Sequence, residues 1–310
     1  MLRVEETGIP TIKDDEALVR VRAAGVDRGT WHLMAGRPYL MRILGFGLRG
    51  PRTAIPGLDV AGTVEAVGSR VTGLRPGDEV FGTANGSFAE YAPARADRLA
   101  PKPADLTFEQ AAAVPVSASA ALQAVRDKAG VQPGEHVLIV GASGGVGTYA
   151  VQIAKADGAE VTGVASTGKL DVVRAMGADH VVDYTQEDFA DGSRRYDVII
   201  DIGGNRPVSH LRRALAPEGR LVITGGENGG DWLGGIGRNL RATLLSPFVR
   251  QKLGAFVSRL RHDDLLALRD LAESGALVPA IDRTFPLEDA PAAVRHLADG
   301  HARGKVVVTI

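Results

Sequence analysis

The strongest constraint on the fold is a run of small residues between a buried strand and a helix. Residues 137–140 are all aliphatic, which is typical of a strand buried on both faces of a parallel sheet. The run Gly141-Ala142-Ser143-Gly144-Gly145-Val146-Gly147 follows this strand directly. Apolar residues then recur at the spacing of a helix, before Gly158 ends the pattern: Val146, Ala150, Ile153 and Ala154. This order predicts a βαβ unit, in which a helix connects two parallel strands.

The same alternation of strand and helix continues for most of the following chain. Five strands are expected, at residues 136–140, 160–165, 180–183, 197–201 and 220–224. An alanine-rich stretch before them, residues 108–129, is expected to be helical. The series predicts a doubly wound α/β domain built on a parallel sheet.

The chain before Pro101 has the pattern of short β-strands. Its apolar and charged residues alternate, as in the segment Val19-Arg20-Val21-Arg22-Ala23, and Gly and Pro interrupt the runs at short intervals. The tail at residues 304–310 also has the character of a strand, one able to return to this β unit. The fold class is therefore α/β, with a β domain followed by a doubly wound domain.

The glycine run is close to a dinucleotide-binding fingerprint, Ala142-x-Gly144-x-x-Gly147, in which alanine stands at the first glycine position. Small residues there let backbone N–H groups approach a pyrophosphate, and the helix N-terminus supplies partial positive charge. The residues expected to bind the cofactor are Ser143, Gly144, Gly145, Val146 and Gly147. A purely structural tight turn is the alternative interpretation.

The same loop also fits the nucleophile elbow of serine hydrolases, Gly141-x-Ser143-x-Gly145. Several histidines lie downstream and could act as the base. Against this hypothesis, the elbow would come before any parallel sheet is built, and a hydrolase would not need Gly147. A serine hydrolase is therefore the weaker alternative.

The end of the second expected strand indicates which dinucleotide binds. NAD-binding domains place an Asp or Glu there for the ribose 2′-hydroxyl, whereas residues 161–170 contain no carboxylate. Ser166 and Lys169 would instead meet a 2′-phosphate, which favours NADP. The alternative is that Ser166 only caps the next helix and Lys169 is solvated.

Composition excludes several classes of function. Lys and Arg total 36 against 37 Asp and Glu, so no excess of positive charge attracts a nucleic acid. Cysteine is absent, which excludes disulfides, thiol nucleophiles and zinc sites built on sulfur. The sequence has no run of apolar residues long enough to span a membrane and no secretory h-region at its start. A cytoplasmic location is expected.

Four segments together resemble the medium-chain dehydrogenase/reductase superfamily, in its zinc-independent quinone oxidoreductase-like branch. They lie in order along the chain, at residues 56–68, 77–81, 141–147 and 300–307. The resemblance implies a GroES-like catalytic domain at 1–115, a Rossmann domain at 116–277 and a return to the catalytic domain at 278–310. It also implies NADPH-dependent hydride transfer to quinones, enones or related carbonyls, which are small-molecule substrates, by a homodimer.

The resemblance also supplies candidate site residues. It places the stretch from Asp27 to His32, together with Tyr39, at the substrate. His32 is the expected oxyanion or proton donor, with a packed histidine and a proton from water as the alternative. Gly203, Gly225 and Gly226 follow successive expected strands, where such folds bind ligands. Tyr184 resembles an adenosine contact of the family.

Some positions depart from the family pattern. Zinc-dependent members carry a cysteine and a Gly-His-Glu where this chain resembles them at Asp27 and at Gly57-Leu58-Asp59, so no metal is expected. Thr30 and Ala120 also differ from the usual residues, which keeps open a second function, an NADPH-binding sensor or partner protein with little catalysis. Relatives usually begin with an additional β segment, so the resemblance leaves open whether the N-terminus is complete.

Two apolar segments with interspersed arginines, residues 37–46 and 231–256, have no assigned role. A lid over a bulky substrate, a dimer surface and a membrane-surface patch are the functional interpretations. Ordinary packing in the core and loops is the alternative.

Overall fold

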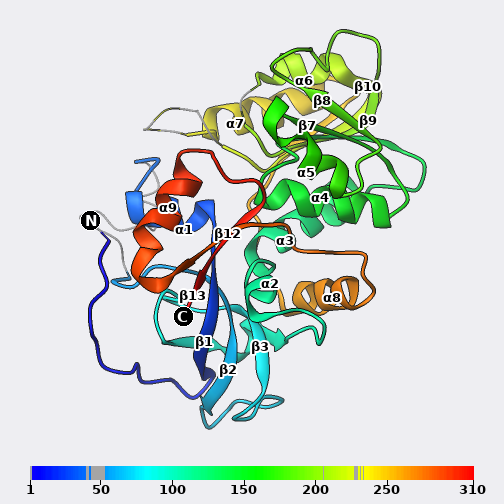
Figure 1. Ribbon diagram of the computed structural model, residues 1–310. Helices are drawn as coiled ribbons and strands as arrows, with labels where there is room; N and C mark the ends of the chain where they lie inside the picture. Colours follow the sequence, from blue (N-terminus) through cyan, green and yellow to red (C-terminus); the bar gives the residue numbers. More distant parts are fainter. Residues whose placement is uncertain are drawn as a thin grey trace. The chain divides into compact units, whose positions relative to one another are not determined.

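The computed structural model describes residues 2–39, 42, 53–204, 206–226, 230, 232 and 234–310. Its contacts divide the chain into two compact units (Figure 1). Unit 1 comprises Met1–Gly36, Gly45–Ser119 and Leu260–Ile310, and unit 2 comprises Arg37–Leu44 and Ala120–Arg259. The domain boundaries near residues 115 and 277 stay predictions of the sequence.

Unit 1 is built on one sheet with the strand order β12-β13-β1-β2-β3-β5, and β4 pairs with β1 beside this path. The strands are β1 (Glu16–Val26), β2 (Asp59–Val67), β3 (Glu79–Thr83), β4 (Tyr91–Arg95), β5 (Leu99–Pro101), β12 (Ile281–Pro286) and β13 (Lys305–Thr309). The tail strand β13 runs antiparallel to β1, with Val306 opposite Val26. The expectation that the C-terminal tail returns to the β unit is therefore confirmed.

Five helices in the described chain include residues of unit 1: α1 (Arg28–Ala35), α2 (Phe108–Ala112), α3 (Pro115–Leu122), α8 (His262–Glu273) and α9 (Ala290–Ala298). The stretch expected to be helical, 108–129, is helical over most of its length, but in three pieces. Helix α2 ends before Pro115, and a π-helical segment, Gln123–Ala129, follows α3. Proline disfavours helical geometry in the residue before it and has no N–H to donate, so a new helix starts there. No helix in the described ranges is both long and apolar enough to cross a membrane.

Unit 2 contains a fully parallel sheet with the order β11-β10-β9-β6-β7-β8. Its strands are β6 (His136–Val140), β7 (Glu160–Ala165), β8 (His180–Asp183), β9 (Tyr196–Asp201), β10 (Leu215–Ile223) and β11 (Lys252–Ala255). The chain builds outward from β6 to β8, then returns to the other side of β6. Ligands of doubly wound sheets bind at such a reversal, between β6 and β9.

The sequence prediction differs from this sheet mainly at two strands, while β9 begins one residue earlier than expected, at Tyr196. Strand β10 begins at Leu215 rather than 220, and its pairing with β9 shifts register between Leu215 and Arg220. Pro217 and Gly219 interrupt the apolar pattern there, which hides the first part of the strand. The prediction missed β11, because its four residues, Lys252–Ala255, show neither alternation nor a continuous apolar run.

Helices cover the parallel sheet, as Figure 1 shows for α4 and α5 beside β7. They are α4 (Gly145–Ala156), α5 (Leu170–Ala175), α6 (Val208–Ala214) and α7 (Ile236–Leu245). A core cluster joins α6 to the sheet through Leu138, Ile199, Leu211, Leu221 and Ile223, all at most 1% exposed. Burial of such side chains stabilises the domain by about 1.5–3 kcal/mol each.

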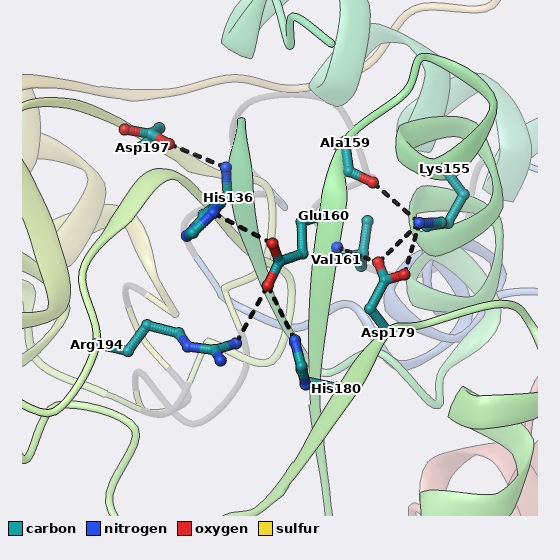
Figure 2. Close-up of polar contacts among 9 residues, drawn as sticks. All are labelled: His136, Lys155, Ala159, Glu160, Val161, Asp179, His180, Arg194 and Asp197. Carbon is teal, nitrogen blue, oxygen red and sulfur yellow. Dashed lines mark hydrogen bonds and ion pairs between the residues drawn. The ribbon is translucent and has the colours of Figure 1, made fainter. Parts of the chain in front are cut away.

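An ion-pair network joins the amino ends of three neighbouring strands (Figure 2). The Glu160 carboxylate lies 3.2 Å from His136 Nε2 and 2.9 Å from His180 Nε2. Beside it, Lys155 Nζ lies 2.7 Å from the Asp179 carboxylate. These side chains are partly exposed, so each pair stabilises the fold only weakly. The network lies at the edge of the sheet opposite the carboxyl ends, where ligands bind.

Candidate functional site

The loop after β6 is folded so tightly that two of its glycines are needed for steric reasons. Gly141 has φ +86°, and an added Cβ would lie 2.8 Å from the amide nitrogen of Gly203. An added Cβ on Gly147 would lie 2.2 Å from the carbonyl oxygen of Gly141, which is closer than side chains approach. The third fingerprint glycine thus allows α4 to pack against the loop.

The N-terminus of α4 has no side-chain cap. Gly144 is the N-cap residue and has no side chain that could accept a hydrogen bond from the first turn. The first N–H groups of a helix lack partners within the helix, and together with the dipole they attract anions. The backbone is therefore suited to a pyrophosphate, as the sequence motif predicts.

The loops after β9 and β10 meet the loop after β6 at the same edge of the sheet. The amides of Ile202 and Gly203 donate to the carbonyl oxygen of Val140, at 3.0 and 2.9 Å. An added Cβ on Gly225 would lie 1.9 Å from the carbonyl oxygen of Ile202. The structure thus brings the predicted residues Gly203 and Gly225 together with the glycine loop. The adjacent Gly226 packs against Gly235, just before α7.

A buried ion pair that the sequence analysis missed fixes this edge. The Asp201 carboxylate is fully buried and pairs with Arg238 from α7. Arg238 also donates to the carbonyl oxygens of Arg206 and Gly225, each at 3.0 Å. Burial raises the pKa of Asp201, and the Arg238 charge opposes that rise. Arg238 therefore links α7 to the ends of β9 and β10, a contact that no local sequence pattern reveals.

The residues expected near the adenosine lie at the ends of β7 and β8. Ser166 makes no capping hydrogen bond to the short 3₁₀ turn of Thr167–Lys169, so capping does not account for its hydroxyl. Tyr184 is 46% exposed, and its amide donates to the carbonyl oxygen of Ala165 at 3.2 Å. Ser166 and Tyr184 thus come from adjacent strand ends.

A carboxylate from the neighbouring strand also lies at this end of the sheet. Asp183 accepts hydrogen bonds from the hydroxyl groups of Thr167 and Thr185, and these bonds lower its pKa. Asp183 comes from β8 and therefore lies outside residues 161–170, the stretch that contains no carboxylate. The Asp183 carboxylate is therefore already hydrogen-bonded to threonine side chains of the protein itself.

The three residues expected at the substrate fall into different units. Asp27 is 6% exposed and caps α1, accepting from the amide of Thr30 at 2.8 Å and from its hydroxyl at 3.1 Å. His32 is half-buried on the same helix, and its ring meets the ring of Trp31 edge-on at 5.0 Å. Tyr39 belongs to unit 2, where its ring lies 5.5 Å from that of Trp232. The structure therefore brings Asp27 and His32 onto one short helix. Their catalytic roles, and that of Tyr39, stay predictions.

The residues at the positions of the family's zinc ligands do not fit a metal ion. The carboxylate of Asp27 is committed to Thr30, and the carboxylate of Asp59 is fully buried beside the ammonium group of Lys305, at 2.9 Å. Lys305 also donates to the hydroxyl of Ser117 at 3.1 Å. Within the ranges that the structure describes, no three His, Asp or Glu side chains are placed to share a metal ion.

The environment of Asp59 shifts its titration strongly. Burial and the nearby Asp27 raise the pKa of Asp59, Lys305 and the amide of Val116 oppose the rise, and the result is about 6. The carboxyl group is therefore mainly ionised at neutral pH, where it is paired with the ammonium group of Lys305. The buried ammonium group of Lys305 is the counter-ion of this carboxylate.

Two family models match the chain, one in its N-terminal part and one in its C-terminal part. Residues 13–104 match the family model of the alcohol dehydrogenase GroES-like domain, and residues 176–308 match that of the zinc-binding dehydrogenase. The chain is 35% identical to the quinone oxidoreductase of Sus scrofa, over 96% of this chain and 89% of that protein. It is 32% identical to the NADPH-dependent alkenal/one oxidoreductase, chloroplastic, of Arabidopsis thaliana, over 97% of this chain and 73% of that protein.

Solved structures agree with the sequence matches. The quinone oxidoreductase from Coxiella burnetii superposes with a TM-score of 0.85 at 28% identity, covering 98% of this chain and 93% of that one. The serine hydrolase hypothesis is wrong, because these relatives are oxidoreductases and Ser143 is only 8% exposed. A nicotinamide cofactor follows from the same relationship. The chain belongs to the medium-chain dehydrogenase/reductase superfamily, in its quinone oxidoreductase-like branch.

Proposed function

We propose that this protein reduces quinones or enones by hydride transfer from NADPH. The observation that carries the proposal is the glycine loop after β6. Gly147 packs against Gly141 in this loop, and the N-cap residue Gly144 gives the first turn of α4 no side-chain cap. The names of two relatives, a quinone oxidoreductase and an NADPH-dependent alkenal/one oxidoreductase, support the substrate class. A homodimer in the cytoplasm is part of the same proposal.

When bound, the reduced nicotinamide supplies the hydride. The backbone N–H groups of Gly144, Gly145 and Val146 would hold the pyrophosphate at the helix N-terminus. Ser166 and Lys169 would bind the 2′-phosphate through a hydroxyl and an ammonium group, and Tyr184 would contact the adenosine. Gly203, Gly225 and Gly226 add no side chains of their own after β9 and β10, which allows the cofactor to lie close to the backbone there.

His32 is proposed as the proton donor to the reduced substrate. An imidazole can donate a proton near neutral pH, and a positioned donor also stabilises negative charge that develops on a carbonyl oxygen. Asp27 acts in this proposal through α1, because its side chain caps the helix that carries His32. Tyr39 is proposed as an additional contact with the substrate.

A steady-state assay with NADPH and a soluble quinone or enone tests the proposed reaction. Wild-type protein is expected to oxidise NADPH only when an acceptor is present. Replacing His32 with glutamine is expected to lower kcat about 100-fold at saturating NADPH, since it removes the proton donor. The exposed His301→Gln variant is the matched control and should keep its rate.

The outcomes separate three possibilities. No oxidation across many acceptors, combined with tight NADPH binding, would support a sensor or partner protein instead of a reductase. Unchanged turnover in His32→Gln would assign the proton to water. Loss of rate only in His32→Gln would support both the reaction and the role of His32.

Cofactor preference is tested by titrating the protein with NADPH and NADH and following nicotinamide fluorescence. NADPH is expected to bind about tenfold more tightly or better, because the 2′-phosphate gains an ammonium partner. Lys169→Glu is expected to abolish that preference, whereas Lys128→Glu, a charge reversal at an exposed lysine elsewhere in unit 2, should keep it. Equal affinities for the two cofactors in the wild type would contradict the proposed role of Ser166 and Lys169.

A further inference from the structure

Helix α7 presents large apolar side chains to solvent along one side. Ile236, Leu240 and Leu244 are 36%, 56% and 62% exposed and lie four residues apart, so they share one face of the helix. Phe248 continues the spacing in the 3₁₀ turn after α7 and is 85% exposed. Of the other apolar segment singled out from the sequence, 37–46, residues 40, 41 and 43–46 lie outside the described residues.

The charged residues around this apolar stripe, Ile236, Leu240, Leu244 and Phe248, are all positive. Residues 232–259 contain five Lys and Arg but no Asp or Glu. Arg238 is the inward-facing member, because it pairs with the buried Asp201. Within the part of the chain that the structure describes, Arg241, Arg250 and Lys252 are exposed and have no acidic partner. The outward cations of this segment are therefore available to an anionic partner.

More cations lie next to the end of the stripe. Arg212, Arg213 and Arg250 line one surface pocket of about 400 Å³, and Val249 of the same pocket directly follows Phe248. Arg212 donates to Gln251, and Arg213 lies 3.6 Å from Asp188, so Arg250 is the member of the three without an acidic or amide partner among the described residues. Apolar and basic groups thus adjoin on one surface.

We propose that this surface docks on an anionic lipid bilayer. We call it the α7 surface and define it by Ile236, Leu240, Leu244, Phe248, Arg241, Arg250 and Lys252. An amphipathic helix with aromatic and aliphatic residues on one face and cations beside them lies in the interface of a bilayer, with the apolar side chains inserted and the cations at the head groups. Each Lys or Arg strengthens such binding about fivefold near an anionic surface.

The charge distribution favours a lipid surface over a second copy of the chain. Two α7 surfaces packed face to face would bring their arginines together, which is unfavourable where water is excluded. An anionic bilayer instead offers acyl chains to the leucines and phosphates to the cations. The inference is independent of the proposed reaction.

Vesicle co-sedimentation of the full chain tests the proposal without any need for turnover. The probes are vesicles of phosphatidylcholine alone and vesicles with equal parts of phosphatidylcholine and phosphatidylglycerol. We expect the protein to sediment with the anionic vesicles at low salt, to be released by high salt, and to stay in the supernatant with phosphatidylcholine alone.

Two double variants separate the apolar and the charged contributions. Leu240→Ser with Leu244→Ser is expected to weaken binding about tenfold or more, since both side chains leave the apolar phase. Arg241→Glu with Arg250→Glu should weaken it by about 25-fold or more, since two cations are lost and reversed. Arg70→Glu with Arg75→Glu is the matched charge control, because these side chains of unit 1 are 70% and 86% exposed. It should bind like the wild type.

Sedimentation of the wild type with neither vesicle would overturn the proposal. Binding that survives both α7 variants would also overturn it. A third result would also overturn the proposal. In it, the protein does not bind anionic vesicles but forms a concentration-dependent dimer, and only the double variant Leu240→Ser with Leu244→Ser dissociates that dimer. That outcome would assign the stripe to contact between copies of the chain. Melting temperatures of all variants, measured without vesicles, confirm that each is folded.

Discussion

Replacing Lys305 with methionine is expected to lower the free energy of unfolding of unit 1 by about 3–5 kcal/mol at pH 7.5. The methionine keeps most of the apolar length of the side chain but removes the ammonium group, which lies 2.9 Å from the Asp59 carboxylate. Asp59 is fully buried and, among the described residues, would keep only the hydrogen bond from the amide of Val116, at 2.7 Å. An unpaired buried charge costs more than a missing contact, because water cannot solvate it.

The loss is expected to depend on pH, with a direction that follows from Asp59. Its pKa is about 6 in the native protein and near 3.8 in an unfolded chain. The native state therefore holds this proton more tightly, and the group's contribution to stability falls as the pH rises from 3.8 through 6. Without Lys305 the native pKa rises further, so the variant loses most stability above pH 6. At pH 5 the carboxyl is largely protonated, and the difference between variant and wild type should shrink.

The two tryptophans allow the measurement to follow unit 1 alone. Trp31 lies in unit 1 and Trp232 in unit 2, so a Trp232→Phe background leaves Trp31 as the reporter. Urea unfolding in this background at pH 7.5 and pH 5 gives the two differences. Lys13→Met, at a side chain that is 78% exposed, is the control and should change stability by less than about 0.5 kcal/mol.

A second substitution checks the cause. Adding Asp59→Asn to Lys305→Met removes the charge that Lys305 compensates and keeps an oxygen for the amide of Val116. Most of the lost stability should return at pH 7.5. An equal loss at both pH values, with no recovery in the double variant, would show that Lys305 acts through packing alone.

The sequence predicted most of the fold because the elements follow local patterns. The strands at 136–140, 160–165 and 180–183 are confirmed residue for residue. The first of them contains a continuous apolar run, 137–140, which is typical of a buried parallel strand. The helical stretch at 108–129 is interrupted before Pro115, where composition favours a helix but the proline ring prevents a continuous one. Local patterns fix an element's type more surely than its ends.

The candidate site was less predictable, because its polar contacts join residues far apart in the chain. Asp59 and Lys305 both lie in segments that carry the family resemblance, yet nothing local shows that one neutralises the other across 246 positions. The pairing of Asp201 with Arg238 depends equally on how α7 returns to the sheet. The glycine loop was predictable because its steric demands lie within seven consecutive residues.

Two alanine substitutions in that loop are expected to separate folding from cofactor binding. An alanine at Gly147 places a Cβ 2.2 Å from the carbonyl oxygen of Gly141, so α4 must move away from the loop. We expect the melting temperature to fall and NADPH affinity to fall about 100-fold or more, because the helix N-terminus loses its position. An alanine at Gly144 meets only that same oxygen, at an ordinary 3.6 Å, and the backbone there has φ −87° and ψ 175°, which alanine adopts readily.

The free protein therefore tolerates Gly144→Ala, and its melting temperature should stay at the wild-type value. Its Cβ would nevertheless occupy the approach to the pyrophosphate, so NADPH affinity should fall at least about tenfold. Fluorescence titration with NADPH and melting curves of the free proteins measure both effects. Gly254→Ala is the control, because an added Cβ there meets nothing within 4 Å. If Gly144→Ala binds NADPH like the wild type, the loop does not hold the pyrophosphate, whatever happens at Gly147. If both variants lose binding and only Gly147→Ala loses stability, steric packing and cofactor contact belong to different glycines of one loop.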